Sequence, residues 1–309
     1  MLTAGQGRGA RVRGARVREA LVWGALGVAT AIALTVPVAY LMASSGGPTG
    51  GPEMVSARPV AVMQTVSSVH VDSMGADVIV TTARVAHVVV TETFGYPPGA
   101  GPSGPVPGRG RGPGSGPAPV PAPPGAVTSV AEGTLTVRDP GCADEESCVR
   151  FALQVPPGTA VSITSDGGSV WVSGTAGTYV DSAGGIVHAT GIDGRLTIVT
   201  GNGDAWIDGV TGVLHADTAG GNSVARNISA PSAVVSTGNG DAWLAFTSPA
   251  SAVTVTTDGG DATLRVPGGP YAVTASSDSG AETLRVPVNP TSPRTITIST
   301  GGGALHLLP

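Results

Sequence analysis

The sequence TGNGDAW occurs at residues 200–206 and again at 237–243, as part of a longer internal repeat. A four-residue pattern, Ser/Thr-x-(Gly/Asn/Ser)-Gly, recurs eight times, and its closing glycines are 17, 18, 18, 19, 20, 20 and 23 residues apart. The eight copies begin at residues 165, 182, 200, 218, 237, 257, 277 and 300. A period near 20 residues with two short alternating segments is typical of stacked β-repeats. We therefore predict an all-β fold, a β-solenoid of about 18–20 residues per coil.

The register of the repeat predicts which side chains face the core. The fourth residue after each closing glycine is always apolar, and these residues are Val172, Ala189, Ile207, Ala225, Leu244, Leu264, Leu284 and Leu307. Because side chains alternate along a strand, the third residue after the glycine must face outward. That position holds Trp171, Trp206 and Trp243 in alternate coils, with His188 and Val224 between them. The three tryptophans are therefore predicted to lie on the surface.

The turns themselves carry three further expectations. The Ser or Thr that opens each turn has inward parity, so its hydroxyl is expected to satisfy turn amides or the neighbouring coil. The Asn-Gly and Gly-Gly pairs are expected to supply positive φ angles. The last unit, STGGGALHLLP, has no later coil to cover it, and we expect it to be a cap or an open edge.

The N-terminus has the pattern of a membrane anchor. Residues 1–19 contain five arginines, and residues 20–43 form an uncharged run long enough to cross a bilayer. The arginines on one side predict a cytoplasmic tail, a single transmembrane helix and an extracytoplasmic remainder. A cleaved signal peptide, which would release a secreted protein, is the alternative. Residues 44–60 are interpreted as a linker and residues 61–309 as the β-repeat domain.

Two local features interrupt the first part of that domain. Residues 95–126 are mostly Gly and Pro, a composition that predicts a disordered insertion. Cys142 and Cys148 are predicted to form a disulfide, because two nearby cysteines outside the cytoplasm usually oxidise. One cysteine pair without a second pair does not suggest a zinc site.

Composition narrows the possible functions. The chain has a formal net charge of -5 and no Lys, which does not favour nucleic-acid binding. It contains no Gly-x-Ser-x-Gly, zinc or P-loop motif, so we expect a non-catalytic protein with no metal or cofactor.

The outward tryptophans are the first candidate binding residues. Trp171, Trp206 and Trp243 would be about 10 Å apart, two coil spacings, which suits stacking against the sugars of a glycan chain. An exposed apolar row also marks protein interfaces. The alternative is that the indoles only shield the sheet or pack beneath the 127–150 segment.

A column of polar residues follows the closing glycines. Asp204, Asn222, Asp241 and Asp261 occupy equivalent positions and offer oxygen ligands that suit calcium. The alternative is that they form local backbone hydrogen bonds beside the turn. Asp241 and Asp261 in adjacent coils are also the kind of carboxylate pair that glycan-processing β-helices use.

The stretch LQVPPGTAVSITSDGGSVWVSGTAG, with the TGNGDAW and TDGGDATLRVP units after it, resembles a bacterial family of β-strand repeat proteins. Its members are described as putative adhesins and are otherwise of unknown function. The resemblance covers residues 150–309 well and 60–94 loosely. It implies a membrane-anchored, stacked β-repeat and transfers no catalytic residues; some members accompany envelope stress systems.

Together these features predict a membrane-anchored adhesin or surface-binding scaffold. Its expected partners are the membrane and either a cell-wall glycan or another surface protein. A stress-sensing or regulatory protein of the cell envelope and a glycan-processing β-helix enzyme are the two alternative functions.

Overall fold

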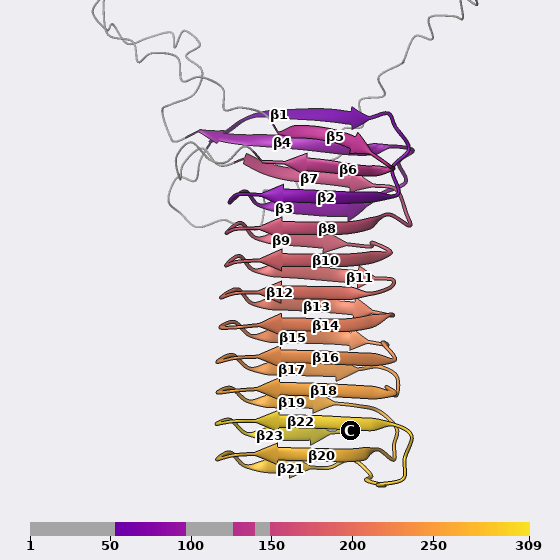
Figure 1. Ribbon diagram of the computed structural model, residues 1–309, viewed down its shortest axis with the longest axis vertical. Helices are drawn as coiled ribbons and strands as arrows, with labels where there is room; N and C mark the ends of the chain where they lie inside the picture. Colours follow the sequence, from indigo (N-terminus) through magenta and orange to yellow (C-terminus); the bar gives the residue numbers. More distant parts are fainter. Residues whose placement is uncertain (1–52, 97–125, 140–148) are drawn as a thin grey trace, which may run out of the picture. The chain divides into compact units, whose positions relative to one another are not determined.

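The computed structural model describes residues 53–96, 126–139 and 149–309, and the described residues form β-strands joined by turns and loops (Figure 1). The predicted transmembrane helix, the predicted Cys142–Cys148 disulfide and most of the predicted insertion lie outside these ranges. Within them, no helix has the length and apolar character needed to span a membrane.

The strands form two sheets. In spatial order, the first sheet contains β1 (Glu53–Val62), β4 (Val88–Tyr96), β7 (Val149–Val155), β3 (Val78–Thr82), β9 (Val170–Ser173), β11 (Val187–Ile192), β13 (Ala205–Val210), β15 (Ser223–Ile228), β17 (Ala242–Phe246), β19 (Ala262–Arg265), β23 (Leu305–Leu308) and β21 (Glu282–Leu284). The second sheet contains β20 (Ala272–Ser277), β22 (Thr295–Thr300), β18 (Ala252–Thr257), β16 (Ser232–Thr237), β14 (Val213–Thr218), β12 (Leu196–Thr200), β10 (Gly177–Ser182), β8 (Ala160–Ser165), β2 (Ser68–Ser73), β6 (Thr134–Arg138) and β5 (Val127–Ala131).

From β8 onward the chain alternates between the two sheets, so that one strand of each makes one coil. Thr178 of β10 pairs with Leu196 of β12, and Leu196 pairs with Leu214 of β14, in parallel and 18 residues apart. The all-β prediction is therefore confirmed, and the parallel pairings are those of stacked coils of the expected length.

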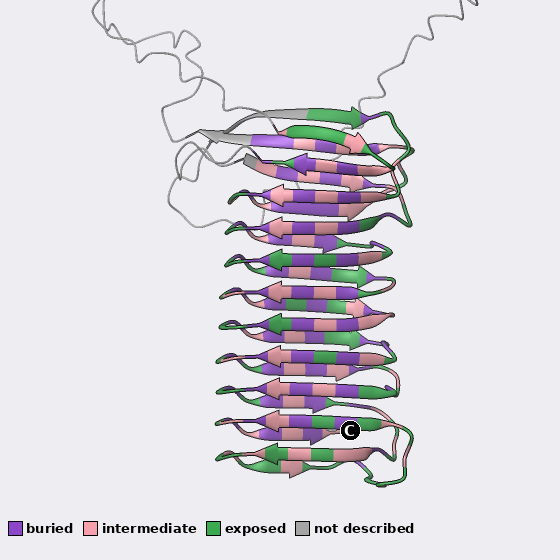
Figure 2. Cartoon of the chain, viewed as in Figure 1, coloured by how far each residue is buried: buried purple, intermediate pink, exposed green. Residues whose placement is uncertain are grey.

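Burial alternates along the strands as the repeat predicted, with purple and lighter residues alternating in Figure 2. The inward column of the first sheet is buried from Val172 to Leu264 and again at Leu307. Leu284 is the exception, because 44% of its surface is exposed. The core thus lies between the two sheets and consists mostly of aliphatic side chains, together with Phe151, Phe246 and Tyr271.

The exposure of Leu284 follows from an unexpected order of the last coils. β22 lies between β18 and β20, and β23 lies between β19 and β21 (Figure 1). The expectation that the final unit STGGGALHLLP would be a cap or open edge is therefore wrong, because the preceding unit covers it. The sequence supplies a reason: the final unit buries Leu305 where the preceding unit has Glu282, and a carboxylate at an inward position costs less at the end of the stack, where water reaches it.

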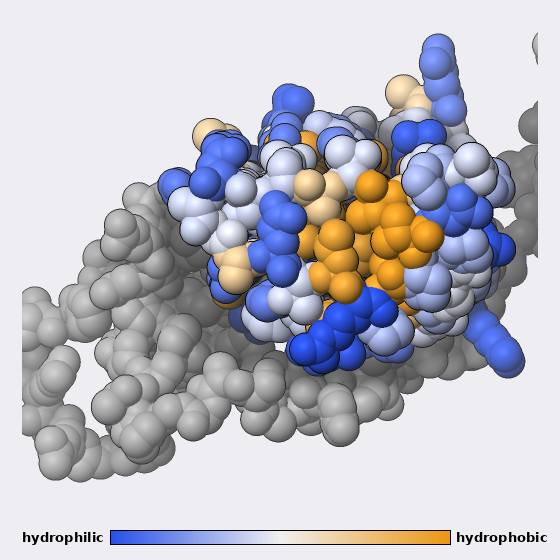
Figure 3. All heavy atoms as spheres, turned by 90° about the horizontal axis from the view of Figure 1, so that it is seen from below, coloured by the Kyte–Doolittle hydropathy of each residue, from blue (hydrophilic) through white to orange (hydrophobic). Residues whose placement is uncertain are grey.

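The end coil leaves part of the core open to solvent. Figure 3 shows apolar residues gathered in the middle of this end and polar residues around them. Leu284 and Val288 are exposed there, and Val273 and Ala275 are only partly buried.

The closing glycines are required for a reason other than the one expected. None of the eight has a positive φ angle, so that expectation is wrong. Instead, a Cβ atom added to Gly185 would overlap the carbonyl oxygen of Gly168, its equivalent in the next coil, and the other seven closing glycines meet the same kind of obstacle. The glycines therefore allow the corners of neighbouring coils to approach closely.

The hydroxyls that open the turns also act differently from the prediction. Thr218 donates a 2.8 Å hydrogen bond to the carbonyl of Gly221, the closing glycine of its own turn. Seven of the eight turns have this bond, and Ser277 of the end coil donates instead to the carbonyl of Gly303. In these seven turns the hydroxyl thus satisfies a buried carbonyl rather than an amide, whereas Ser277 also accepts a 2.8 Å hydrogen bond from the backbone N–H of Gly280, as predicted.

The N-terminal end of the stack extends further along the chain than expected. β1 begins at Glu53, within the predicted 44–60 linker, and pairs antiparallel with β4. β4 continues to Tyr96 and so includes the first two residues of the predicted insertion.

Candidate functional site

The outward column of the first sheet contains a row of flat side chains, as the parity of the repeat predicted. Trp171 is the direct cross-strand partner of His188, and His188 is the partner of Trp206. The column continues through Val224 to Trp243. We call the residues Trp171, His188, Trp206, Val224 and Trp243 the aromatic row.

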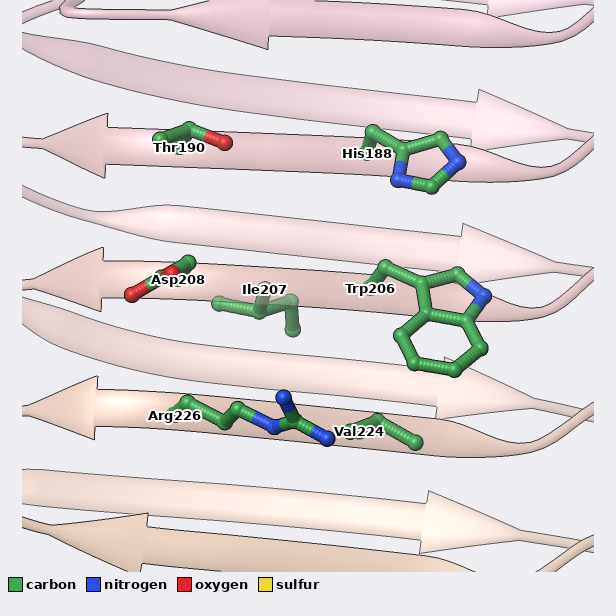
Figure 4. Close-up of a pocket in the computed structure, with 7 residues that line it drawn as sticks. All are labelled: His188, Thr190, Trp206, Ile207, Asp208, Val224 and Arg226. Carbon is green, nitrogen blue, oxygen red and sulfur yellow. The ribbon is translucent and has the colours of Figure 1, made fainter.

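The first three rings of the aromatic row stack on one another. The ring centroids of Trp171 and His188 are 5.8 Å apart with planes 5° from parallel, and those of His188 and Trp206 are 6.4 Å apart with planes 17° from parallel. Trp206 keeps 39% of its surface exposed, and Figure 4 shows the rings of His188 and Trp206 both turning a face toward the viewer. Rings held in this way form a rigid apolar platform, because each one limits the rotation of the next.

A shallow pocket lies beside this platform. Its volume is about 220 Å³, and its lining residues are His188, Thr190, Trp206, Ile207, Asp208, Val224 and Arg226 (Figure 4). The pocket thus combines an aromatic wall with a hydroxyl, a carboxylate and a guanidinium.

Three of these polar residues come from a second outward column that the sequence reasoning missed. Thr190, Asp208 and Arg226 each stand five positions after a closing glycine and are cross-strand partners in successive coils. The same alternation that placed the tryptophans outside also places this position outside. The signal was therefore present in the sequence, but the residue types vary too much for the column to stand out.

Arg226 contacts the last indole of the aromatic row. Its Cζ atom lies 5.3 Å from the centroid of the Trp243 ring, within the range of a cation–π interaction. Asp208 bonds to a different residue: its Oδ1 accepts a 2.6 Å hydrogen bond from the side-chain amide of Asn227.

The predicted acidic column forms a hydrogen-bond ladder along one corner of the stack. Asp204 Oδ1 accepts from the backbone N–H of Asn222 at 2.8 Å, and Asn222 Oδ1 accepts from that of Asp241 at 2.9 Å. Asp241 Oδ1 accepts from Asp261 N–H at 2.8 Å, and Asp261 Oδ1 accepts from Ala304 N–H at 2.7 Å. Each side chain therefore joins its corner to the next coil. The alternative expectation, that these residues accept backbone hydrogen bonds, describes this arrangement, except that the N–H donor lies in the neighbouring coil and not in the same turn.

The ladder gives these carboxylates a structural role. Asp204 and Asp241 do not line the pocket, and of the three tryptophans proposed with them as binding residues only Trp206 does. Within the described ranges, no group of three or more His, Cys, Asp or Glu side chains is placed to hold a metal ion.

Burial between the indoles lowers the pKa of His188 below its ordinary value of 6.5. The ring is therefore neutral at pH 7 and stacks on Trp171 and Trp206 as an uncharged aromatic group. Because the folded-state pKa lies below the unfolded value, the stability that His188 contributes is complete above about pH 6.5 and is lost as the pH falls through the folded-state pKa.

We predict that replacing Trp206 with alanine raises the pKa of His188 toward 6.5, because water regains access to the imidazole. A pH titration of the imidazole resonances by NMR measures this value. Tyr179→Ala, which removes an exposed aromatic ring from the second sheet, serves as the control and should leave the pKa unchanged. An unchanged pKa in Trp206→Ala would contradict the burial explanation.

Comparison with known proteins gives only structural likenesses. No family model matches the chain, and no curated protein matches it. A solved structure of a putative adhesin from Bacteroides fragilis is 13% identical with a TM-score of 0.43, and the likeness covers 83% of this chain and 97% of that one.

Two further structures are similar in the same way. A putative adhesin from Parabacteroides merdae is 9% identical with a TM-score of 0.42, covering 82% of this chain and 96% of that one. A putative adhesin from Parabacteroides distasonis is 12% identical with a TM-score of 0.41, and the likeness covers 83% of this chain and 98% of that one. These three solved structures are described as putative adhesins, the same description as the family that the repeat units resemble.

Proposed function

We propose that this chain is a non-catalytic binding or scaffold module of the cell surface, anchored to the membrane by residues 20–43, and that its aromatic row binds a glycan. The observation that carries the proposal is the stacked platform of Trp171, His188 and Trp206 beside a pocket with polar walls. Apolar faces of sugar rings pack on flat aromatic surfaces, while their hydroxyls need hydrogen-bond partners at the edge. The pocket supplies such partners in Thr190 and Asp208.

The length of the row suits an extended ligand better than a single sugar. Trp171 and Trp206 stand two coils apart, and Trp243 stands a further two coils along the same column. Parallel strands are about 4.8 Å apart, so successive indoles are about 10 Å apart, which is of the order of a disaccharide repeat. The names of the similar structures agree with a surface-binding role.

The carboxylate ladder supports a non-catalytic role. Asp241 and Asp261, the pair that an enzyme would need, each accept a backbone hydrogen bond from the next coil. Both residues are held in place as parts of the corner.

We expect a triple variant to bind insoluble bacterial cell-wall glycan at least tenfold more weakly than the unmodified protein, because indole anchors supply most of the contact energy in such sites. The variant combines Trp171→Ala, Trp206→Ala and Trp243→Ala. Co-sedimentation of the full-length chain over a range of glycan concentrations measures this loss.

Tyr179→Ala is the matched control, because it removes an exposed aromatic ring from the opposite sheet. Its affinity should equal that of the unmodified protein, and the thermal unfolding of both variants should show that each is folded. Equal binding by the triple variant and the unmodified protein would refute the proposed glycan surface.

A further inference from the structure

The aromatic row contains one position without a ring. Val224 lies between Trp206 and Trp243. The equivalent position between Trp171 and Trp206 is occupied by the imidazole ring of His188. Figure 4 shows that Arg226 extends along its strand toward Val224, and its Cζ atom lies 5.3 Å from the Trp243 centroid. The guanidinium therefore lies beside the ring-free position and contacts the indole of Trp243.

The charge of this guanidinium is not matched by its neighbour. Asp208 is the direct cross-strand partner of Arg226, but in Figure 4 its carboxylate turns away from the arginine, and it accepts a hydrogen bond from Asn227. The ion pairs found in residues 53–96, 126–139 and 149–309 are Arg138–Asp72 and Arg150–Asp77, and neither involves Arg226. Arg226 is also exposed, so a ligand can reach it.

The Cζ atom of Arg226 lies over the indole ring of Trp243, and none of its N–H groups takes part in an ion pair in the part of the chain that the structure describes. These donors have a fixed planar spacing that matches the two oxygens of a carboxylate. From this geometry we infer that the aromatic row binds carboxylate-bearing glycans, such as chains of uronic acids. Arg226 pairs with a sugar carboxylate, while the rings of the same chain stack on Trp206 and Trp243.

This inference rests on the proposed glycan-binding function and adds to it the class of ligand. It also gives the pocket a division of roles. Arg226 recognises the acid group, whereas Asp208 and Thr190 accept or share hydrogen bonds with the sugar hydroxyls.

A matched pair of ligands tests the inference. The probes are a hexamer of a uronic acid and the same hexamer after its carboxyl groups have been reduced to primary alcohols. Calorimetric titration of the full-length chain should show about tenfold tighter binding of the acidic hexamer at low salt, and this preference should shrink as the ionic strength rises.

Two arginine variants locate the effect. Arg226→Gln should bind the acidic hexamer about tenfold more weakly and the reduced hexamer unchanged, whereas Arg265→Gln, which removes an exposed charge outside the pocket, should keep the preference. Arg226→Lys keeps the charge but not the planar edge, and should recover only part of the lost affinity.

The outcomes separate this inference from the function on which it rests. Equal binding of both hexamers, abolished by the triple tryptophan variant, would overturn the acidic-ligand inference and leave the glycan surface standing. An equal loss of preference in Arg226→Gln and Arg265→Gln would overturn the assignment to Arg226. Failure of the unmodified chain to bind either hexamer would overturn the acidic-ligand inference, whereas the glycan surface itself is tested by the co-sedimentation with cell-wall glycan.

Discussion

Gly185→Ala is expected to lower the free energy of unfolding by about 3 kcal/mol or more, the upper range for forcing extra volume into a packed site. A Cβ atom at this position would overlap the carbonyl oxygen of Gly168 in the neighbouring coil. Both atoms belong to the backbone or are fixed to it, so no side-chain rotation can relieve the overlap. The coils would have to separate at this corner, which would weaken the parallel pairing of β9 with β11. Chemical denaturation of the full-length chain measures the change.

Gly184→Ala is the control, because it adds the same methyl group one residue earlier. Gly184 has no positive φ angle, and a Cβ atom there would meet nothing within 4 Å. We expect a change of less than about 1 kcal/mol, since alanine also reduces the entropy of the unfolded chain. Similar effects of the two substitutions would show that the closing glycines are not required for the close approach of the coils.

Leu307→Ala is expected to destabilise the protein by about 2–5 kcal/mol, although it lies two residues from the end of the sequence. The reason is that β23 lies inside the stack, where Leu307 is completely buried and pairs with Leu264 on one side and Leu284 on the other. Truncating it leaves a cavity in the core rather than a gap at an edge.

Leu284→Ala removes the same side chain from the coil that precedes it in sequence but ends the stack in space. Leu284 is 44% exposed, so its loss should cost less than about 1 kcal/mol. If the two coils were stacked in sequence order, Leu284→Ala would be the more destabilising substitution and Leu307→Ala the milder one. Denaturation of both variants therefore tests the order of the last coils directly.

The repeat alone predicted most of the fold. The spacing of the glycines predicts the coil length, and the alternation of Val, Ile and Leu with polar residues predicts which face of each strand is buried. The outward position of Trp206 follows from the same alternation, because Ile207 beside it must face the core. The inner and outer faces could be predicted because they depend on residues a few positions apart, and the coil length because the same turn recurs along the chain.

The geometry of the proposed binding surface could be predicted only in part. Trp171, Trp206 and Trp243 were found from their place in the repeat, but the stacking of His188 and the position of Arg226 over Trp243 are contacts between side chains in different coils. Asp204 and Asp241 look like ligands in the sequence, and the structure shows that they bond to the backbone of the next coil.

Only the tertiary structure decided the order of the final coils and the role of the closing glycines. Every coil carries nearly the same turn and strand pattern, so the repeat by itself does not specify which unit stacks against β18 and β19. The choice depends on a global comparison of energies: the unit that buries Leu305 and Leu307 gains more in the interior than the unit with Glu282 and Leu284. By itself, then, the sequence determined the length of the coil and the inner and outer faces of its strands. The order of the coils and the groups that meet across them depended on the packed stack, because they arise between residues that the sequence does not bring together.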